Sequence, residues 1–113
     1  MANADTPHYL TRLTVKHDQH RVRLQVDDID WIESAANYAC LHLGGSTCIV
    51  RMTMRELERR LDPTRFVRIH RSSIVQVDRI RAVVPAWHGD CDVTLIDGTI
   101  LRLTRNYRSR LVQ

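Results

Sequence analysis

Residues 66–75 read Phe-Val-Arg-Ile-His-Arg-Ser-Ser-Ile-Val, and this stretch says most about the fold. Apolar and polar residues alternate over its first five positions, and a period of two is typical of a strand with one buried face. Val67 and Ile69 would lie on the buried face, and Arg68 and His70 on the other. The Arg-Ser-Ser triplet then interrupts the pattern, so the chain is expected to turn there. A cationic strand edge of this kind suits phosphates or base edges, although a half-buried strand with an ordinary basic solvent face has the same pattern.

Similar alternation on both sides of this stretch predicts further short strands joined by tight turns. Gly44-Gly45 is expected to form a two-residue hairpin turn, and Asp97-Gly98 a turn of type I′, because both sequences accept positive φ angles. Residues 35–37 are expected to form a loop in which Asn37 tolerates a left-handed conformation. The further strands are predicted at residues 10–16, 21–26, 29–34, 38–43, 46–51, 78–84, 93–96 and 99–104.

One amphipathic helix is predicted after Thr53. Thr53 and Glu56 have the spacing of a capping box, and Asp62-Pro63 ends the helical pattern. The apolar stripe of this helix, at i, i+3 and i+7, consists of Met54, Leu57 and Leu61. Residues 105–111 are predicted to be a loop that leads into a short basic turn or helix. The predicted fold class is mostly β, with roughly eight to ten short antiparallel strands and one short α-helix.

Length and composition indicate one globular domain. The chain has 113 residues, of which 43% are hydrophobic, which argues against disorder. No segment approaches the roughly 18–20 apolar residues that cross a bilayer. The first residues have neither the basic start nor the apolar segment of a signal peptide, so a cytoplasmic location is expected. We expect residues 1–9 to be a flexible tail or the remnant of a linker, and residues 10–113 to be the domain.

Charge is distributed unevenly along the chain. Residues 1–50 carry four Lys/Arg and six Asp/Glu, a net charge of −2, whereas residues 51–113 carry thirteen and seven, a net charge of +6. The last twelve residues contain no acid and four arginines, which are Arg102, Arg105, Arg108 and Arg110. A basic half of this kind favours a nucleic-acid partner, and a solvated basic surface is the alternative.

The sequence offers little for a metal centre or an enzyme. Zinc ligands usually come in close pairs, and His17 and His20 are the only near pair, with no companion pair of cysteines. Cys40, Cys48 and Cys91 lack a Cys-x-x-Cys spacing and are expected to be reduced packing residues. No nucleophile motif, phosphate-cradling glycine loop or carboxylate pair stands out, so we predict no catalytic site, metal or cofactor.

The two tryptophans could stack bases in a protein that binds single strands. Trp31 lies in an apolar run and is predicted to belong to the core. Trp87 lies in a predicted loop at residues 85–90, where it is expected to be exposed, and the sequence leaves its role open.

Several segments together resemble the LytTR DNA-binding domain, the output module of many bacterial response regulators. Order and spacing agree over residues 10–113, and Phe-x-Arg-x-His-Arg-Ser at 66–72 is the most specific segment. Ser73 and Gln76 depart from the pattern, because the family usually has an aromatic residue and often Asn at these places. The other matching segments are Ile29–Ser34, Asn37-Tyr38, Leu41–Leu43, Met54–Glu58 with Leu61, Ile74-Val75, Asp97-Gly98 and Leu103–Arg105.

The resemblance implies an elongated arrangement of short sheets that binds duplex DNA through loops in successive major grooves. The residues implied to face DNA are Asn37, Tyr38, His70, Arg71, Arg105, Asn106 and Arg108. Asn37, Arg71 and Arg105 would reach base edges or nearby phosphates. Asn106 and Arg108 would hold the DNA backbone beside Arg105. His70 either contacts a phosphate or bridges strand and loop by hydrogen bonds.

The same resemblance implies a bacterial transcriptional regulator or its output domain. Such a domain would be monomeric in isolation and would pair on a DNA site with two similar elements. A sensory or receiver domain would act on it in cis or in trans. The alternative is an RNA-binding or protein-interaction β module without sequence-specific readout of DNA.

Overall fold

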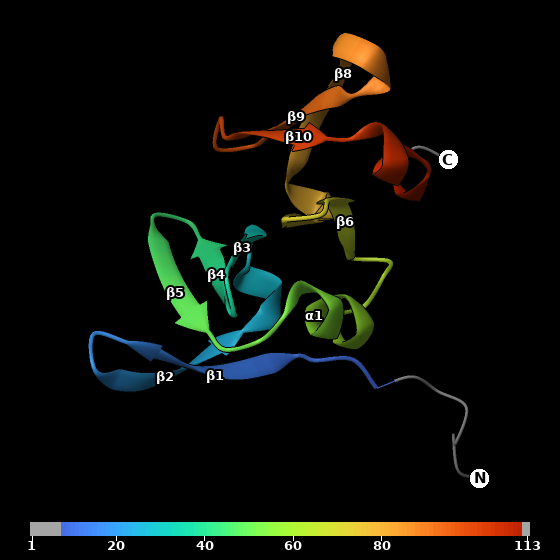
Figure 1. Ribbon diagram of the computed structural model, residues 1–113. Coiled ribbons are helices and arrows are strands. Elements are labelled where there is room, and N and C mark those ends of the chain that lie inside the picture. Colours follow the sequence, from blue (N-terminus) through green and yellow to red (C-terminus); the bar gives the residue numbers. More distant parts are fainter. Residues whose placement is uncertain (1–7, 112–113) are drawn as a thin grey trace, which may run out of the picture.

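The computed structural model describes residues 8–111, and of the predicted tail at 1–9 only residues 8 and 9 fall in this range. The described residues form ten strands, one α-helix and four 3-10 segments (Figure 1). The strands are β1 (Arg12–His17), β2 (His20–Gln25), β3 (Trp31–Ala35), β4 (Tyr38–Leu43), β5 (Ser46–Val50), β6 (Phe66–His70), β7 (Ser73–Gln76), β8 (Ile80–Pro85), β9 (Cys91–Leu95) and β10 (Ile100–Leu103). The helical segments are α1 (Met54–Arg60), η1 (Val26–Asp28), η2 (Val77–Arg79), η3 (Trp87–Gly89) and η4 (Arg105–Arg110).

The strands form two antiparallel sheets, which confirms the mostly-β class. The larger sheet has seven strands in the order β2-β1-β5-β4-β3-β7-β6, and the smaller has three in the order β10-β9-β8. Figure 1 shows the three-stranded sheet at one end of the molecule, beyond β6. No helix within residues 8–111 is long and apolar enough to cross a membrane.

Two apolar clusters lie on opposite faces of the large sheet at strand β7. Ile74 on β7 belongs to the first cluster, which includes Leu57 of α1, and Val75 belongs to the second, which includes Val93 of β9. Neighbouring residues of β7 therefore serve different cores, as the period of two requires. Trp31 is only partly buried against the second cluster and stacks on His42 with ring centroids 4.1 Å apart, so it lies at the edge of the core and not within it.

Helix α1 forms where the capping box predicts it. The Thr53 side chain accepts a hydrogen bond from the backbone N of Glu56 at 3.0 Å, and the predicted apolar stripe is buried. The helix has only seven residues, Met54–Arg60, because Leu61 already has extended φ and ψ angles of −89° and 150°. So short a helix depends on tertiary packing for its stability.

Two turns differ from the predictions. In the β3–β4 turn the left-handed residue is Ala36, with φ 58°, and not Asn37. In the β9–β10 hairpin only Gly98 has positive φ, so the turn is not of type I′. The backbone N of Leu95 donates to Thr99 O at 2.8 Å and that of Gly98 to Leu95 O at 2.9 Å, which closes a three-residue loop with Gly98 at its left-handed position.

The stretch at 66–75 forms strands β6 and β7 with the predicted turn between them, but Arg68 does not lie on an open cationic edge. Its side chain is 18% exposed, and Nη1 lies 3.2 Å from Glu58 Oε1 of α1. The ring of Tyr107 in η4 lies beneath its guanidinium, 5.7 Å from the ring centroid. A bulge between Arg68 and His70 also breaks the strict alternation. Elements from other parts of the chain thus cover the face that the pattern assigned to solvent.

A buried amide fastens the end of β7 to η1 and to Ile29, which follows it. Gln76, at the end of β7, is fully buried, and its Nε2 donates to the carbonyl oxygens of Asp27 at 3.0 Å and Ile29 at 2.6 Å. Arg79 in η2 follows and pairs with Asp30 at 2.7 Å. These contacts fasten the segment where the chain leaves the large sheet for the small one.

Candidate nucleic-acid interface

The β3–β4 and β6–β7 turns lie at the same end of the large sheet. Strand β3 pairs antiparallel with β7, with Glu33 opposite Ser73, and the backbone N of Ser34 donates to Ser72 O at 2.9 Å. The C-terminal end of β3 therefore meets the N-terminal end of β7. This register brings Asn37, in the first turn, and Arg71, in the second, to one edge of the molecule.

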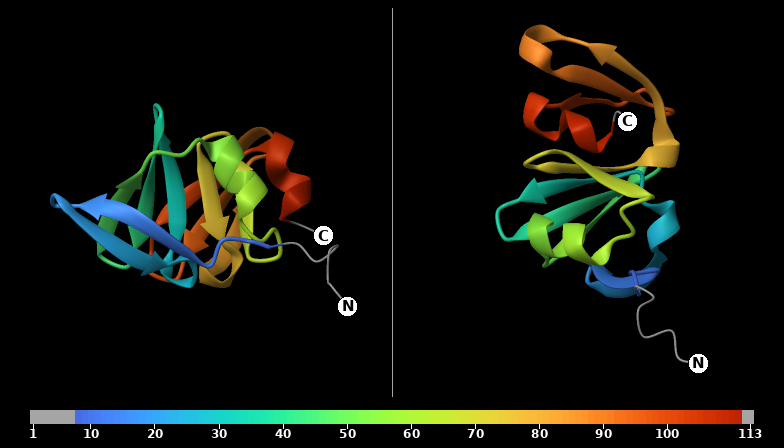
Figure 2. Two further views of the ribbon diagram at one scale, coloured as in Figure 1. Left: turned by 90° about the horizontal axis from the view of Figure 1, so that it is seen from below. Right: turned by 90° about the vertical axis from the view of Figure 1, so that its right-hand side faces the viewer.

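The segment after the last strand reaches the same edge from the small sheet. The backbone N of Thr104 donates to Ile69 O of β6 at 2.9 Å. Because Arg105 and His70 are the next residues, η4 begins beside the β6–β7 turn. The right-hand view in Figure 2 shows η4, in red, and the yellow β6–β7 turn on one side of the molecule.

Segment η4 is held in place by a network around Glu58 of α1. Glu58 pairs with Arg68 through Oε1, at 3.2 Å, and with Arg110 through Oε2. Arg110 also lies over the ring of Tyr107, 4.7 Å from its centroid. The backbone that carries Arg105 and Arg108 is therefore braced against both α1 and β6.

The four C-terminal arginines are not alike, although the sequence shows no acid near them. Arg102 pairs with Asp90 at 3.5 Å and Asp92 at 3.3 Å, and Arg110 pairs with Glu58. The acids come from other elements, so the absence of acids from the last twelve residues does not leave all four arginines unpaired. Arg105 and Arg108 keep side chains without an ion pair within residues 8–111.

Five of the predicted site residues share two properties. Their side chains are exposed, and none makes a hydrogen bond or ion pair in the described part of the chain. They are Asn37, Arg71, Arg105, Asn106 and Arg108. These groups are donors of the kind that binds phosphates and the acceptor edges of bases, and no competing internal bond must be broken to use them.

His70 differs because it is half-buried and bonded within its own turn. Its Nδ1 accepts from the backbone N of Ser72 at 3.1 Å and lies 2.8 Å from the Ser72 hydroxyl. The side chain therefore bridges strand and turn, as one of the two predicted roles requires. This bond supports the turn that carries Arg71.

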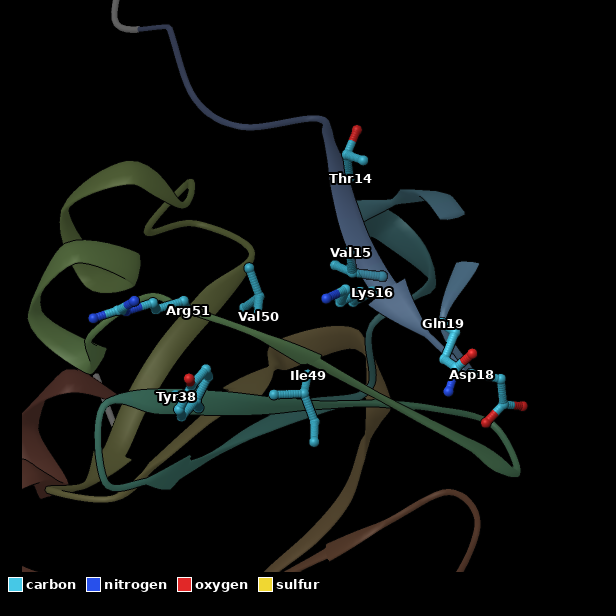
Figure 3. A pocket seen from close by; sticks show the side chains of 9 residues that line it. All are labelled: Thr14, Val15, Lys16, Asp18, Gln19, Tyr38, Ile49, Val50 and Arg51. Atoms are coloured by element: carbon cyan, nitrogen blue, oxygen red, sulfur yellow. The ribbon is translucent and has the colours of Figure 1, made fainter. Parts of the chain in front are cut away.

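Tyr38 follows Asn37 at the start of β4 and differs from the unpaired donors in its surroundings. Its half-exposed ring lines an open, mostly apolar groove of about 470 Å³ between β1 and β5 (Figure 3). The opposite wall carries Val15 and Lys16, and Ile49 lies beside the ring. Tyr38 thus borders the predicted interface without joining the cluster around Arg105.

The β8–β9 turn is a neighbour of the site that sequence reasoning did not connect with it. A Cβ atom on Gly89 would lie 3.0 Å from Cδ of Arg105, so the two residues are packed in close contact. Asp90 Oδ1 accepts from the backbone N of Arg105 at 2.9 Å. The only sequence signal was the Trp-His-Gly turn itself, which says nothing about what it touches.

Neither the cysteines nor the histidines gather into a metal site in the described residues. Cys40, Cys48 and Cys91 form no disulfide in the described residues, and they lie buried or half-buried in strands. Within residues 8–111 no group of three or more His, Cys, Asp or Glu side chains is placed to hold a metal ion.

A family model and a solved structure that resemble this chain carry the same family name. The family model described as the LytTr DNA-binding domain matches residues 19–113, which leaves β1 before the matched range. The CO-responsive transcriptional regulator RcoM of Rhodospirillum rubrum is 30% identical over 76 residues, 67% of this chain and 32% of that protein. The chain therefore spans about a third of the length of this curated relative.

A solved LytTr DNA-binding domain from Bacillus cereus has the same fold, with a TM-score of 0.82 at 22% identity, over 88% of this chain and 92% of that one. This family is a class of DNA-binding domains and not of enzymes. The fold and the matched range lead to one conclusion: this chain is a member of the LytTR family of DNA-binding domains.

Proposed function

We propose that this domain reads a specific sequence in duplex DNA by placing its turns in the major groove. One observation carries the proposal. Three segments far apart in the sequence contribute Asn37, Arg71 and Arg105, and the pairing of the backbone brings these residues to one edge with their side chains unpaired. An Arg fork matches guanine O6 and N7, and Asn can pair with adenine. Asn106 and Arg108 lie beside Arg105 on η4 and suit the neighbouring phosphates.

The proposed biological role is that of the DNA-reading part of a transcriptional regulator. RcoM is by its name a CO-responsive transcriptional regulator, and this chain corresponds to about a third of it. A sensory or receiver domain, in cis or in trans, would control the DNA-reading domain. One small domain offers few base contacts, so we propose that two copies bind two similar DNA elements and that the isolated domain is monomeric.

The experiment has two steps. Selection from a random duplex pool first identifies the preferred site, which should contain a repeated element. Competition binding then compares wild type with Arg105→Ala on the selected and a scrambled duplex, with Arg23→Ala as control. Arg23 has the same charge, is exposed, and lies on β2 at the opposite edge of the large sheet.

Arg105→Ala should cost roughly 1–3 kcal/mol on the selected duplex and much less on the scrambled one. The Arg23 variant should change neither by a comparable amount. Equal losses on both duplexes would make Arg105 a backbone anchor. A pool that yields no preferred duplex would refute sequence-specific readout.

A further inference from the structure

We infer that the β8–β9 turn, residues 86–90, is an additional contact with the DNA backbone, beside the base read by Arg105. This inference rests on the proposed function, because it needs a duplex on the Arg105 side of the molecule. It assigns two residues to the contact, Trp87 and His88. Their partner is one phosphate and its deoxyribose in the same duplex.

The turn and Arg105 form one continuous surface. The alkyl part of the Arg105 side chain lies against Gly89, where an added Cβ would be only 3.0 Å from Cδ and 3.2 Å from Cγ. Asp90, at the end of the turn, accepts a hydrogen bond from the backbone N of Arg105 at 2.9 Å. A DNA strand that meets the Arg105 guanidinium therefore also passes the turn.

Between the turn and η4 lies a shallow hollow that suits a phosphate. It is lined by His88, Asp90, Thr104, Arg105 and Asn106. The carboxylate of Asp90 is already engaged, by the Arg105 backbone through Oδ1 and by Arg102 at 3.5 Å through Oδ2. The groups left to meet a ligand are mainly donors, from the imidazole, the guanidinium and the amide, and donors of this kind bind phosphate oxygens.

Trp87 precedes His88 in the turn, and the centroids of their rings lie 6.0 Å apart. The Trp87 side chain is 78% exposed, more than any other large hydrophobic residue in the described part of the chain. An indole ring has a broad apolar face and one N–H donor, so it can cover a sugar and still bond to the adjoining phosphate. Burial against DNA would remove apolar area that the free domain leaves in water.

Hydrogen bonds hold the backbone of the turn that carries these two side chains. The backbone N of Ala86 donates to Asp90 O at 2.8 Å, and that of Asp90 donates to Trp87 O at 3.0 Å. His88 has φ 56° and ψ 33°, a left-handed conformation that non-glycine residues adopt infrequently. The right-hand view in Figure 2 shows this turn, in orange, on the same side as η4 and the β6–β7 turn. A duplex along that side would meet all three.

Two variants test the contact without disturbing the fold. Trp87→Ala removes the exposed ring, and His88→Gly removes the imidazole while glycine keeps the left-handed φ without strain. Ile96→Ala is the matched control, because Ile96 is 60% exposed on the turn at the other end of β9. Each test variant should weaken selected and scrambled duplexes alike, by about three- to tenfold for the Trp87 ring. The control should bind as wild type does.

A second measurement uses the wild-type protein. Acrylamide quenching of Trp87, taken as the difference between wild type and Trp87→Phe, should fall when the selected duplex is added. The inference would be overturned if duplex binding depends on Arg105 while acrylamide quenches Trp87 as before and both variants bind as wild type does. That result would leave the proposed function standing. Failure of wild type to bind any duplex would remove both.

Discussion

Replacing Gln76 with leucine tests the segment from Gln76 to Arg79, the joint through which the chain passes from the large sheet to the small one. The spacing of the turns at the proposed interface depends on this joint. The amide is fully buried at the end of β7, and its Nε2 is the donor for the Ile29 carbonyl at 2.6 Å. Leucine has a similar volume and leaves no cavity, so the change isolates the polar contacts. It removes the donor and leaves a carbonyl that water does not reach.

The expected size of the effect follows from what each partner of the amide retains. The Asp27 carbonyl keeps a second donor, Arg79 Nη2 at 2.8 Å, so it loses little. The oxygen of the Gln76 amide accepts only long hydrogen bonds, from Arg65 and Arg79. Arg79 keeps its ion pair with Asp30 at 2.7 Å and Arg65 keeps its ion pair with Asp27 at 3.0 Å, so the loss of these long bonds matters little. The orphaned Ile29 carbonyl then accounts for most of the loss, about 1–3 kcal/mol.

Urea unfolding of Gln76→Leu should therefore show a lower midpoint with an unchanged slope, and Tm should fall by roughly 5–15 °C. The control is Gln25→Leu, the same substitution at an exposed position of β2, which should stay within about 0.5 kcal/mol of wild type. If the two variants unfold at the same urea concentration, the buried amide does not stabilise the joint and the reasoning fails.

Three further predictions concern salt, metal and pH. If about six phosphates are neutralised, log K for duplex binding should fall against log salt with a slope of about −5, whereas affinity indifferent to salt would argue against DNA. A chelator should change neither Tm nor DNA binding, because the sequence has no ligand set with zinc spacing; stoichiometric zinc lost on unfolding would contradict this. Hydrogen bonds from Thr64 lower the pKa of Asp62 below 3.8, and those from Thr99 lower the pKa of Asp97. Both carboxylates should therefore stabilise the fold above about pH 4 and lose that contribution as the pH falls through their pKa values in the folded state. The Tm of Asp62→Asn and that of Asp97→Asn should consequently fall less on acidification than the Tm of wild type.

Local patterns predicted most of the elements, since strands and caps depend on neighbours in the sequence. The period of two placed β6 and β7 and the turn between them, and the capping box placed the start of α1. Gly98 was recognised as a turn residue, but the hydrogen bonds of the hairpin decided which kind of turn it makes. The start of β8 at Ile80 was also missed, because the preceding residues coil into η2 beside Gln76.

Contacts between segments that are distant in the sequence could not be predicted from local patterns. Arg68 looked like a solvent-facing cation because nothing within the strand shows that Glu58 and Tyr107 lie over it. Arg102 and Arg105 looked equivalent, yet one is paired with Asp90 and Asp92 and the other is not. The candidate site residues came from a family resemblance, and only the strand register brings them to one edge.

The pairing of arginines bears directly on the proposed discrimination between DNA sequences. An unpaired cation anywhere on the surface attracts any phosphate and raises nonspecific affinity. Arg68, Arg79 and Arg102 are instead paired with acids and brace β6, the joint between the sheets, and the small sheet. Arg71 and Arg105 are left unpaired on turns that those braced elements hold in register. The backbone positions from which these two guanidinium groups reach the proposed interface are therefore held in place, and an Arg fork distinguishes bases only when its geometry is fixed.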